Sequence, residues 1–539
     1  MSGENDLANR KSNASGDIIE VGQEYRKKFV LQKIIPNKNA VKHNNRTCHI
    51  HDLEYYDITY NCIGISVRDL IGDRDRSFSN MLSAVFRSIV ELTNMQSGGI
   101  GFINFDSDIA VYIHNESDDE IIDSFREFFL DLNMNTRKGC EKPYVTFNYG
   151  VDTGEKARRA SFLMLRAFEL GDENLEKFSV NYDLYQKSLS VTAKKMIPTY
   201  FNCDSTSNKN LSAENIGIMG CRTRVAPNVN GKQGAFNRGN VACATLNLVQ
   251  LAYLAKRDIE KFYKLLDENL EDAKELLLHR FYTLISKGKF DEFYDKRYYL
   301  DSERHNAEAM LKNGTLSIGF IGLWDAVSVL YGFHLNSEKE MKKYANEAYE
   351  IVQYMREYTD KITEKEHLNF SLLASAAEGV TGKFAQYDAQ NAGKGYDVCE
   401  KGYYTNSFHV PVSVEMNYRS KIDFEGKFHR LCNGGAITYV ELKEMPGKNI
   451  EAVEEIIEYA YSRDCNYMGI NFPLDNCLEC GYIGRIADHC PWCKSDHIRK
   501  LRRVSGYLSE DKSFTLGKRK ELADRKYHTE NFTKSERRI

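Results

Sequence analysis

The most informative stretch of this chain lies near its C-terminus and reads Arg502-Arg503-Val504-Ser505-Gly506-Tyr507-Leu508. Its glycine has a chemical property that no other residue shares. A radical on an α-carbon must be planar and lie between an amide donor and a carbonyl acceptor, and only glycine reaches this geometry without a Cβ colliding with its neighbours. Taken alone, a Gly-Tyr pair is more commonly a turn. A cysteine cluster that ends at Cys493, thirteen residues before Gly506, makes an interpretation beyond a simple turn worth considering.

The cluster consists of two Cys-x-x-Cys pairs separated by nine residues, Cys477-Leu478-Glu479-Cys480 and Cys490-Pro491-Trp492-Cys493. Each pair can place two thiolates on one tetrahedral ion, so the spacing predicts a closed structural Zn²⁺ site. A redox role for either pair is the alternative. His489 and His497 lie close by, but four cysteines already complete a tetrahedron. The predicted ligands are therefore Cys477, Cys480, Cys490 and Cys493.

The composition is that of an ordinary globular protein, with 539 residues of which 42% are hydrophobic and 28% charged. A formal net charge of -4 gives no bulk indication of nucleic acid or of a membrane as partner. The polar start, residues 1–16, does not resemble a signal peptide or a membrane span, and we expect it to be a disordered lead-in. Without an export signal, the thirteen cysteines are expected to be reduced thiols of a cytoplasmic protein.

The chain is expected to hold one large mixed α/β domain at residues 46–465, because helical and strand-like patterns alternate there without a Pro-rich or Gly/Ser-rich linker. A zinc-binding module follows at 466–498, and the Gly506 loop with a basic tail occupies 499–539. Periodicity predicts helices over Phe78–Met95, Glu155–Leu170, Asp258–Ser286 and Glu338–Tyr358. Strand-like runs are Tyr144–Phe147, Thr315–Ile321 and Ala436–Glu441.

A zinc module followed by Arg-Val-x-Gly-Tyr-Leu resembles the C-terminus of the anaerobic, class III ribonucleotide reductases, which are glycyl radical enzymes. The resemblance continues through separated motifs in family order from about residue 46 to 528: His49-Ile50-His51-Asp52-Leu53-Glu54-Tyr55-Tyr56 with Asn61-Cys62, Gln96-Ser97-Gly98-Gly99, Met219-Gly220-Cys221-Arg222, Arg238-Gly239-Asn240 with Leu246-Asn247-Leu248, Asn406-Ser407-Phe408-His409-Val410-Pro411-Val412, and Gly434-Gly435-Ala436-Ile437-Thr438-Tyr439-Val440-Glu441-Leu442.

The resemblance implies a fold: a ten-stranded α/β barrel of the glycyl radical enzyme and ribonucleotide reductase type, with a small C-terminal zinc-ribbon module and a glycyl radical loop. Family members commonly carry an N-terminal ATP-cone domain. Residues 1–45 are too few for one, so we expect a partly disordered N-terminal extension in its place.

The same resemblance implies roles for four residues. Gly506 would carry the stored radical, and Cys221, at the tip of a loop threaded through the barrel, would become the thiyl radical that attacks the ribose. A thiol suits this relay because its S–H bond is comparable in strength to the glycine C–H bond. Cys62 would be the second active-site thiol, and Asn240 would hydrogen-bond substrate or formate. Considered alone, Cys221 would be a buried structural cysteine and Asn240 a cap or turn residue.

The function implied is the anaerobic reduction of ribonucleoside 5′-triphosphates to 2′-deoxyribonucleoside triphosphates for DNA synthesis, with formate as reductant. Cys243, close after Asn240, keeps reduction by a small redoxin open as the alternative. The expected cofactors are Zn²⁺ and the glycyl radical itself. The expected partners are the ribonucleoside triphosphates, a radical S-adenosylmethionine activating enzyme with an iron–sulfur cluster, and a second copy of the chain in a homodimer. Nucleic acid and membrane are not expected as partners.

Two departures from the family pattern keep alternatives open. The segment between Leu170 and Tyr182 is shorter than in the family, and Ser505 stands where family members often have cysteine. The sequence Arg-Val-Ser-Gly-Tyr also resembles the corresponding motif of the formate-lyase and diol dehydratase branch of glycyl radical enzymes. That branch lacks the four-cysteine ribbon. A zinc-ribbon nucleic-acid binding protein is the alternative from another class, and it would explain only the C-terminal part of the chain.

Overall fold

The structure is a computed structural model that describes residues 13–72, 74–171, 184–391, 397–504 and 506–528. Its helices are α1 (Ala14–Lys33), α2 (Asn37–Asn44), α3 (Val67–Ile71), α4 (Phe78–Met95), α5 (Phe105–Ala110), α6 (Asp118–Leu132), α7 (Glu155–Leu170), α8 (Leu184–Lys195), α9 (Leu248–Ala255), α10 (Ile259–Lys287), α11 (Asp291–Lys296), α12 (Ala307–Leu311), α13 (Leu323–Tyr331), α14 (Glu338–Lys343), α15 (Ala345–Glu366), α16 (Val380–Asn391), α17 (Asp397–Glu400), α18 (Tyr418–His429), α19 (Ile450–Ser462) and α20 (Leu516–Asp524).

The strands are β1 (Cys48–Ile50), β2 (Ile63–Ile65), β3 (Ile100–Phe102), β4 (Val145–Phe147), β5 (Tyr200–Phe201), β6 (Ile218–Met219), β7 (Thr223–Arg224), β8 (Asn240–Asn247), β9 (Thr315–Ile321), β10 (Asn369–Ala374), β11 (Thr438–Glu441), β12 (Tyr467–Asn471), β13 (Leu474–Cys477), β14 (Ile483–Gly484), β15 (Ile498–Arg503) and β16 (Leu508–Glu510).

Ten of the described strands form the wall of an α/β barrel, in three sheets with the orders β1-β8-β9-β10, β11-β12-β5 and β2-β3-β4. Single bridges connect the sheets, from Gly64 to Arg238 and from Leu373 to Gly435. The strands β8, β9 and β10 run parallel, and every residue of β8 and β9 is buried. Parallel strands are usually covered on both faces, which accounts for the complete burial of β8 and β9.

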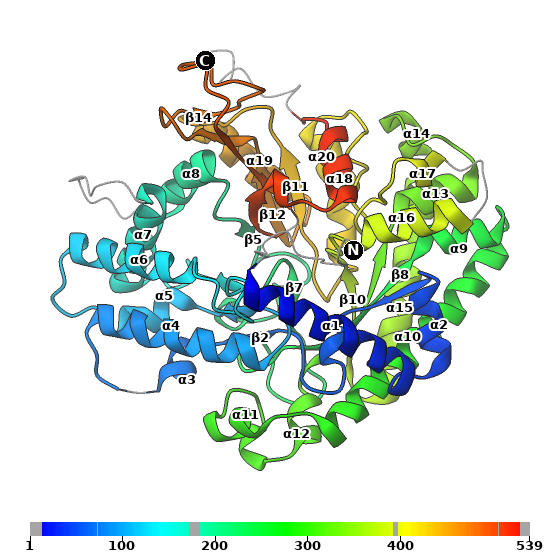
Figure 1. The fold of residues 1–539 in the computed structure, drawn as a ribbon, viewed down its shortest axis with the longest axis horizontal. Helices are drawn as coiled ribbons and strands as arrows, with labels where there is room; N and C mark the ends of the chain where they lie inside the picture. Colours follow the sequence, from blue (N-terminus) through cyan, green and yellow to red (C-terminus); the bar gives the residue numbers. More distant parts are fainter. Residues whose placement is uncertain (1–12, 73, 172–183, 392–396, 505, 529–539) are drawn as a thin grey trace.

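Helices cover the outside of the wall. α10, which is 29 residues long, packs on β8 and β9, and α15 packs on β10. In Figure 1, α4, α6 and α7 lie on one side of the strands, and α9, α10 and α13 lie on the other. These helices shield the wall from water, so the interior of the barrel is where a protected site can form.

A short hairpin of β6 and β7 runs through the inside of the barrel. On one side it packs against the sheet β2-β3-β4, where a Cβ added to Gly101 would lie 2.9 Å from the carbonyl oxygen of Ile218. On the other side the amide of Arg224 donates to the carbonyl of Gly434 at 3.0 Å. The hairpin is therefore held between two parts of the wall, and its turn carries Cys221.

The C-terminal module is an antiparallel sheet of the strands β14-β13-β15-β16. β13 begins at Leu474, close behind the wall strand β12, which pairs with β11 and β5, so the wall continues past residue 465. β15 and β16 pair with each other, and the turn between them contains Gly506. Figure 1 shows this module at the end of the barrel beside α19 and α20.

Most of the predicted elements are found in the structure, with shifts that have local causes. The helices predicted over Phe78–Met95 and Glu155–Leu170 and the strand Thr315–Ile321 have the predicted bounds, whereas Asp258 is the N-cap of α10 rather than its first residue. The helix predicted over Glu338–Tyr358 is wrong as one element. It divides at Tyr344, whose ring stacks on Phe333 with centroids 4.6 Å apart.

Two further predictions need correction. The strand predicted from Ala436 begins at Thr438, because the preceding backbone turns inward to meet the hairpin. The disordered lead-in predicted through Gly16 is wrong for its last residues: α1 starts at Ala14, and the side chain of Asn13 caps it by accepting from Gly16 N at 2.8 Å. The rest of the lead-in, the segment 172–183 and Ser505 lie outside the described residues. Within those residues, no helix has the length and apolar character needed to cross a membrane.

Candidate active site

Gly506 lies directly against Cys221 inside the barrel. A Cβ placed on Gly506 would overlap the Cβ of Cys221, would lie 2.6 Å from its Cα and would be 3.0 Å from the hydroxyl oxygen of Tyr144. Contacts this short leave room for hydrogen alone, so only glycine fits here. The fold therefore brings together two residues that are separated by 285 positions in the sequence and that the sequence motifs single out independently.

Cys221 occupies the turn of the hairpin between β6 and β7. Gly220 precedes it with φ at +57°, a left-handed conformation that favours glycine. Its side chain faces an internal cavity, so it keeps some accessible surface deep inside the barrel. Burial raises the pKa of the Cys221 thiol above its ordinary value, while nearby Arg222 and a hydrogen bond with Tyr144 act in the opposite direction. The neutral S–H form, which can give up a hydrogen atom, is therefore favoured.

Cys62 stands just before β2 and lines the same cavity. Its Sγ accepts a hydrogen bond from the amide of Gly99 at 3.3 Å, and a Cβ added to Gly98 would lie 2.5 Å from this sulfur. The two glycines thus let the backbone approach the thiol closely. Burial is the main cause that raises the pKa of Cys62 to about 12, and Cys221 is close enough to contribute. Both thiols are held neutral in one enclosure.

Asn240 is the first residue of β8, and its backbone anchors Cys62. The carbonyl of Asn240 accepts from the amides of Asn61 at 3.0 Å and Cys62 at 3.2 Å. Gly239 makes this approach possible, since a Cβ there would collide with the carbonyl of Cys62. The side-chain amide donates to Thr315 and to Ser317.

The cavity that these residues share has a volume of about 280 Å³. This is close to the lower end of the range for small-molecule sites, roughly 300 Å³. Its lining includes three of the residues predicted from the sequence, and also Tyr507, the residue that follows Gly506. Among the residues that line it are Cys62, Cys221, Asn240, Tyr144, Glu378 and Tyr507.

Two of these lining residues, Tyr144 and Glu378, have no signal in the sequence. The ring of Tyr144 meets that of Tyr507 edge to face with centroids 6.0 Å apart. The hydroxyl of Tyr507 donates to the carboxylate of Glu378 at 2.9 Å. Tyr144 belongs to a run that reads only as a strand, and Glu378 follows a loop after β10. Their proximity to Gly506 arises from the tertiary fold, so no local pattern could have identified them.

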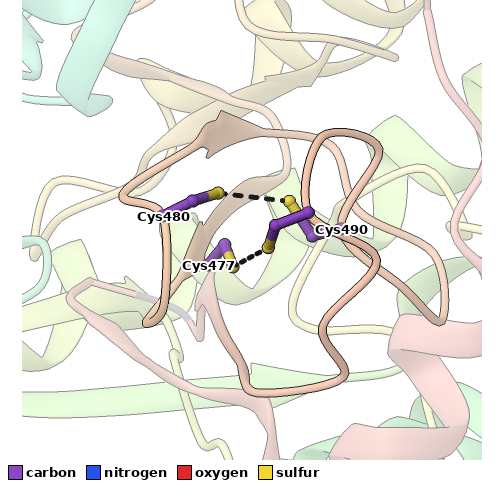
Figure 2. Close-up of side chains that lie close together, drawn as sticks. Cys477, Cys480 and Cys490 are labelled. Atoms are coloured by element: carbon purple, nitrogen blue, oxygen red, sulfur yellow. Dashed lines mark hydrogen bonds between the residues drawn. The ribbon is translucent and has the colours of Figure 1, made fainter.

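The four cysteines of the C-terminal module form a compact cluster. Their sulfur atoms all lie within 4.8 Å of one another, with Cys477 and Cys493 at 3.5 Å and Cys480 and Cys490 at 3.5 Å (Figure 2). A tetrahedral Zn²⁺ with four thiolates requires sulfur atoms about 3.8 Å apart, given Zn–S bonds of about 2.3 Å. The cluster therefore fits a zinc ion. His497 instead bonds to Glu479 at 3.0 Å, outside the cluster.

Comparison with known proteins shows which family the chain resembles in sequence and in fold. Residues 5–528 match the family model described as anaerobic ribonucleoside-triphosphate reductase. Proteins of that name from Escherichia coli (28% identical, covering 97% of this chain and 84% of the relative) and from phage T4 (24% identical, covering 97% of each) are similar along almost the whole chain. The fold is shared with an anaerobic ribonucleotide reductase (TM-score 0.75, 17% identity, 96% and 90% coverage).

A second solved structure gives the same result for the fold. It is the anaerobic ribonucleotide reductase from Thermotoga maritima in complex with dATP and CTP, with a TM-score of 0.70 at 17% identity and coverage of 94% of this chain and 92% of the other. The match of the family model extends from the N-terminal helices through the barrel to the Gly506 loop. This chain belongs to the anaerobic ribonucleoside-triphosphate reductase family.

Proposed function

We propose that this enzyme reduces ribonucleoside 5′-triphosphates to 2′-deoxyribonucleoside triphosphates with a radical that Gly506 stores and Cys221 delivers, and with formate as the reductant. The observation that carries the proposal is the contact between Gly506 and Cys221, with Cys62 lining the same cavity. The residue proposed to store the radical thus contacts the thiol proposed to relay it, and the thiol proposed to complete the reduction lines the same cavity as that relay.

The chemistry follows from the order of these groups. The Gly506 radical takes the hydrogen atom of the Cys221 thiol, and the resulting thiyl takes the 3′-hydrogen of the ribose. The 2′-hydroxyl then leaves as water, and Cys62 gives a hydrogen atom to the substrate and pairs with Cys221. Formate supplies the two electrons of the reduction and leaves as carbon dioxide. At the end, Cys221 returns the 3′-hydrogen to the product, and the resulting thiyl takes back the hydrogen atom of Gly506, so that both thiols and the glycyl radical are restored.

The neutral state of both thiols supports this sequence. Hydrogen-atom transfer needs an S–H bond, and burial raises the pKa of Cys62 and of Cys221 above that of an ordinary thiol. A thiolate nucleophile would need the opposite shift, toward a lower pKa. The enclosure thus favours radical transfer over nucleophilic attack.

The zinc site has a mechanical part in this proposal. Cys477 ends β13, which pairs with β15, and β15 leads into the turn that contains Gly506. Zn²⁺ held by Cys477, Cys480, Cys490 and Cys493 would fix this sheet and thereby aim the turn at Cys221. The ion would have a structural role, since four cysteine ligands leave no open coordination position.

The remaining partners are part of the same proposal. A radical S-adenosylmethionine activating enzyme with an iron–sulfur cluster would remove the hydrogen atom from Gly506, and two copies of the chain would form a homodimer. Residues 46–471 would form the catalytic barrel, which extends the domain limit predicted at 465 by one strand. Reduced thiols are used for both the metal and the chemistry, which supports a cytoplasmic location.

Anaerobic activation followed by electron paramagnetic resonance tests the radical. We expect a doublet from one α-hydrogen that is absent in Gly506→Ala, and a signal that survives this substitution would contradict the proposal. Ribonucleotide turnover with formate, compared with turnover of pyruvate or a diol, separates the reductase from the formate-lyase type. Binding of DNA or RNA with steep salt dependence and no turnover would favour the zinc-ribbon binder instead.

A further inference from the structure

Arg222, the residue that follows Cys221, is a buried cation with an incomplete set of partners. Its side chain is 1% exposed, and its Nη1 lies 3.4 Å from the carbonyl oxygen of Ala374 and 3.4 Å from Nε2 of His409. Among the described residues, Nε and Nη2 have no hydrogen-bond partner, so no nitrogen of Arg222 bonds to a carboxylate there. A buried charge is unfavourable unless it is paired and hydrogen-bonded, so this position favours an anion.

His409 holds the guanidinium of Arg222 from one side. Its Nδ1 lies 3.2 Å from a carboxylate oxygen of Glu425, which also forms an ion pair with Lys421. A carboxylate only accepts hydrogen bonds, so Nδ1 carries the proton and Nε2 accepts from Nη1 of Arg222. Burial lowers the pKa of His409, which favours this neutral ring. The amino group Nη1 is therefore fixed, and the opposite edge of the guanidinium is left for a ligand.

That edge has the shape that recognises a carboxylate. The N–H groups of Nε and Nη2 point the same way from one planar group, and two parallel hydrogen bonds from such a pair match the two oxygens of a carboxylate. A spherical anion cannot use both donors in this manner. The two atoms of Arg222 without a partner are thus the two that together bind a planar anion.

Arg222 lines a second cavity, which has a volume of about 60 Å³. Of the residues that the structure describes, Arg222 alone lines both this cavity and the one that contains Cys221. Thr405 lines the second cavity as well, and its buried Oγ1 has no hydrogen-bond partner within the described ranges. A water molecule needs about 10–15 Å³ of such space. The cavity therefore has room for the three non-hydrogen atoms of formate and excludes a nucleotide.

The lining of the second cavity carries more positive than negative charge. Its carboxylates are Glu441 and Glu521, whereas its lysines and arginines are Arg222, Lys421, Lys518, Arg525 and Lys526. Lys526 is exposed and Arg222 is buried, so the cationic lining extends from the surface to the wall of the active-site cavity. Such a lining raises the local concentration of small anions.

We infer that the second cavity is the binding site of formate, with the carboxylate on Nε and Nη2 of Arg222. The inference rests on the proposed function, which takes formate as the reductant. Oxidation of formate gives carbon dioxide, one proton and two electrons, and these electrons, with that proton and one from solvent, convert a Cys62–Cys221 disulfide into two thiols. Carbon dioxide has no charge, so the guanidinium does not retain the product.

The test measures binding of [13C]formate to the full-length protein before activation, by broadening of the formate carbon signal in nuclear magnetic resonance. Arg222→Gln removes the charge and the paired donors, and we expect it to weaken formate binding about tenfold. Arg222→Lys keeps the charge without the planar pair and should weaken binding about threefold. Nitrate, which is planar and carries the same charge, should displace formate at lower concentrations than chloride does.

Further variants separate this site from a general effect on the fold. Thr405→Val keeps the side-chain shape and removes the unpartnered hydroxyl, so it should weaken formate binding about threefold even if the Arg222 variants do not fold. Lys287→Gln, which removes an exposed lysine at the end of α10, is the control and should bind formate unchanged. Binding of CTP, measured on the same proteins, should be unaffected in every variant.

The inference fails if Arg222→Gln and Thr405→Val bind formate as tightly as the unsubstituted protein, or if the unsubstituted protein does not bind it. Equal weakening of CTP and formate by Arg222→Gln would assign this residue to the nucleotide instead. Turnover of the activated, unsubstituted enzyme with formate is measured alongside. Turnover combined with unchanged formate binding in the variants would reject this site alone, whereas absence of turnover would reject the function on which it rests.

Discussion

The α-carbon of Gly506 and the side chain of Cys221 are in direct contact, with no space between them for even one additional methyl group. The two residues come from different parts of the fold, the turn after β15 and the hairpin inside the barrel. A hydrogen atom can therefore pass between them without an intermediate group, provided that the turn is held in this position.

Gly506→Ala is expected to abolish the radical for two separate reasons. Alanine cannot store it, and its Cβ would overlap Cys221 and displace the turn. After anaerobic activation, electron paramagnetic resonance should show no doublet and turnover should be absent. Gly22→Ala is the matched control, because Gly22 lies in α1 with open space around its Cβ position. A doublet in the Gly506 variant would show that the radical resides elsewhere.

Cys477→Ser is expected to leave the barrel folded and to prevent radical formation. Cys477 is buried at the end of β13, and three cysteines bind Zn²⁺ less well than four, so the sheet that supports the Gly506 turn should loosen. Zinc content, circular dichroism and the radical signal are measured together. Cys203→Ser, which removes a thiol outside the cluster, should activate normally. Normal activation of the Cys477 variant without metal would disprove the mechanical role of zinc.

Air should cut the activated chain at Gly506. Oxygen adds to a glycyl radical and cleaves the backbone there, so gel analysis after exposure should show loss of a small C-terminal piece that starts near this residue. The protein that has not been activated should remain intact under the same conditions. Cleavage at a distant position, or equal cleavage without activation, would contradict the assignment of Gly506.

The pH dependence should reflect two protected thiols. Burial raises the pKa of Cys62 to about 12 and that of Cys221 above its usual value. The neutral form persists below the folded-state pKa, so turnover should not fall between about pH 7.5 and 9.5, where an ordinary thiol with a pKa of about 8.5 ionises. A pH–rate profile that declines with an apparent pKa near 8.5 would show that a thiol is not protected.

The same shifts have a consequence for stability. Above about pH 8.5 the unfolded chain loses thiol protons that the folded chain keeps, so the free energy of unfolding should decrease as the pH rises. Urea unfolding of the protein before activation, at a series of pH values, measures this slope. Cys62→Ala should reduce the slope, since it removes one of the shifted groups. An unchanged slope would mean that Cys62 ionises alike in both states.

The sequence predicts the outer helices more reliably than the inner wall. α4 and α7 are amphipathic, and their bounds follow from the spacing of apolar residues. β8 is not predicted, although it is central to the sheet, because its sequence contains two alanines and has asparagine at both ends, and both residue types are depleted in strands. Its importance becomes visible only when β1 and β9 are placed on either side of it.

The candidate site, like the fold, is only partly predictable from the sequence. Cys221, Cys62, Asn240 and Gly506 stand in motifs, and the resemblance to a known family indicates them from the sequence alone. The hydroxyl of Ser317, which fixes the Asn240 amide, belongs to an ordinary apolar run and carries no motif. Its contribution depends on the register that sets β8 beside β9, which is a property of the folded sheet.

The position of Gly506 near the end of the chain orders the events of biosynthesis. Every strand of the barrel wall, the last of them ending at Asn471, leaves the ribosome before Gly506 does. Domains can fold while synthesis continues, so the enclosure around Cys221 can form while the residue that will store the oxidising equivalent has not yet been made. In the proposed function, the residue that stores the radical is thus added to a barrel whose wall strands have all been synthesised.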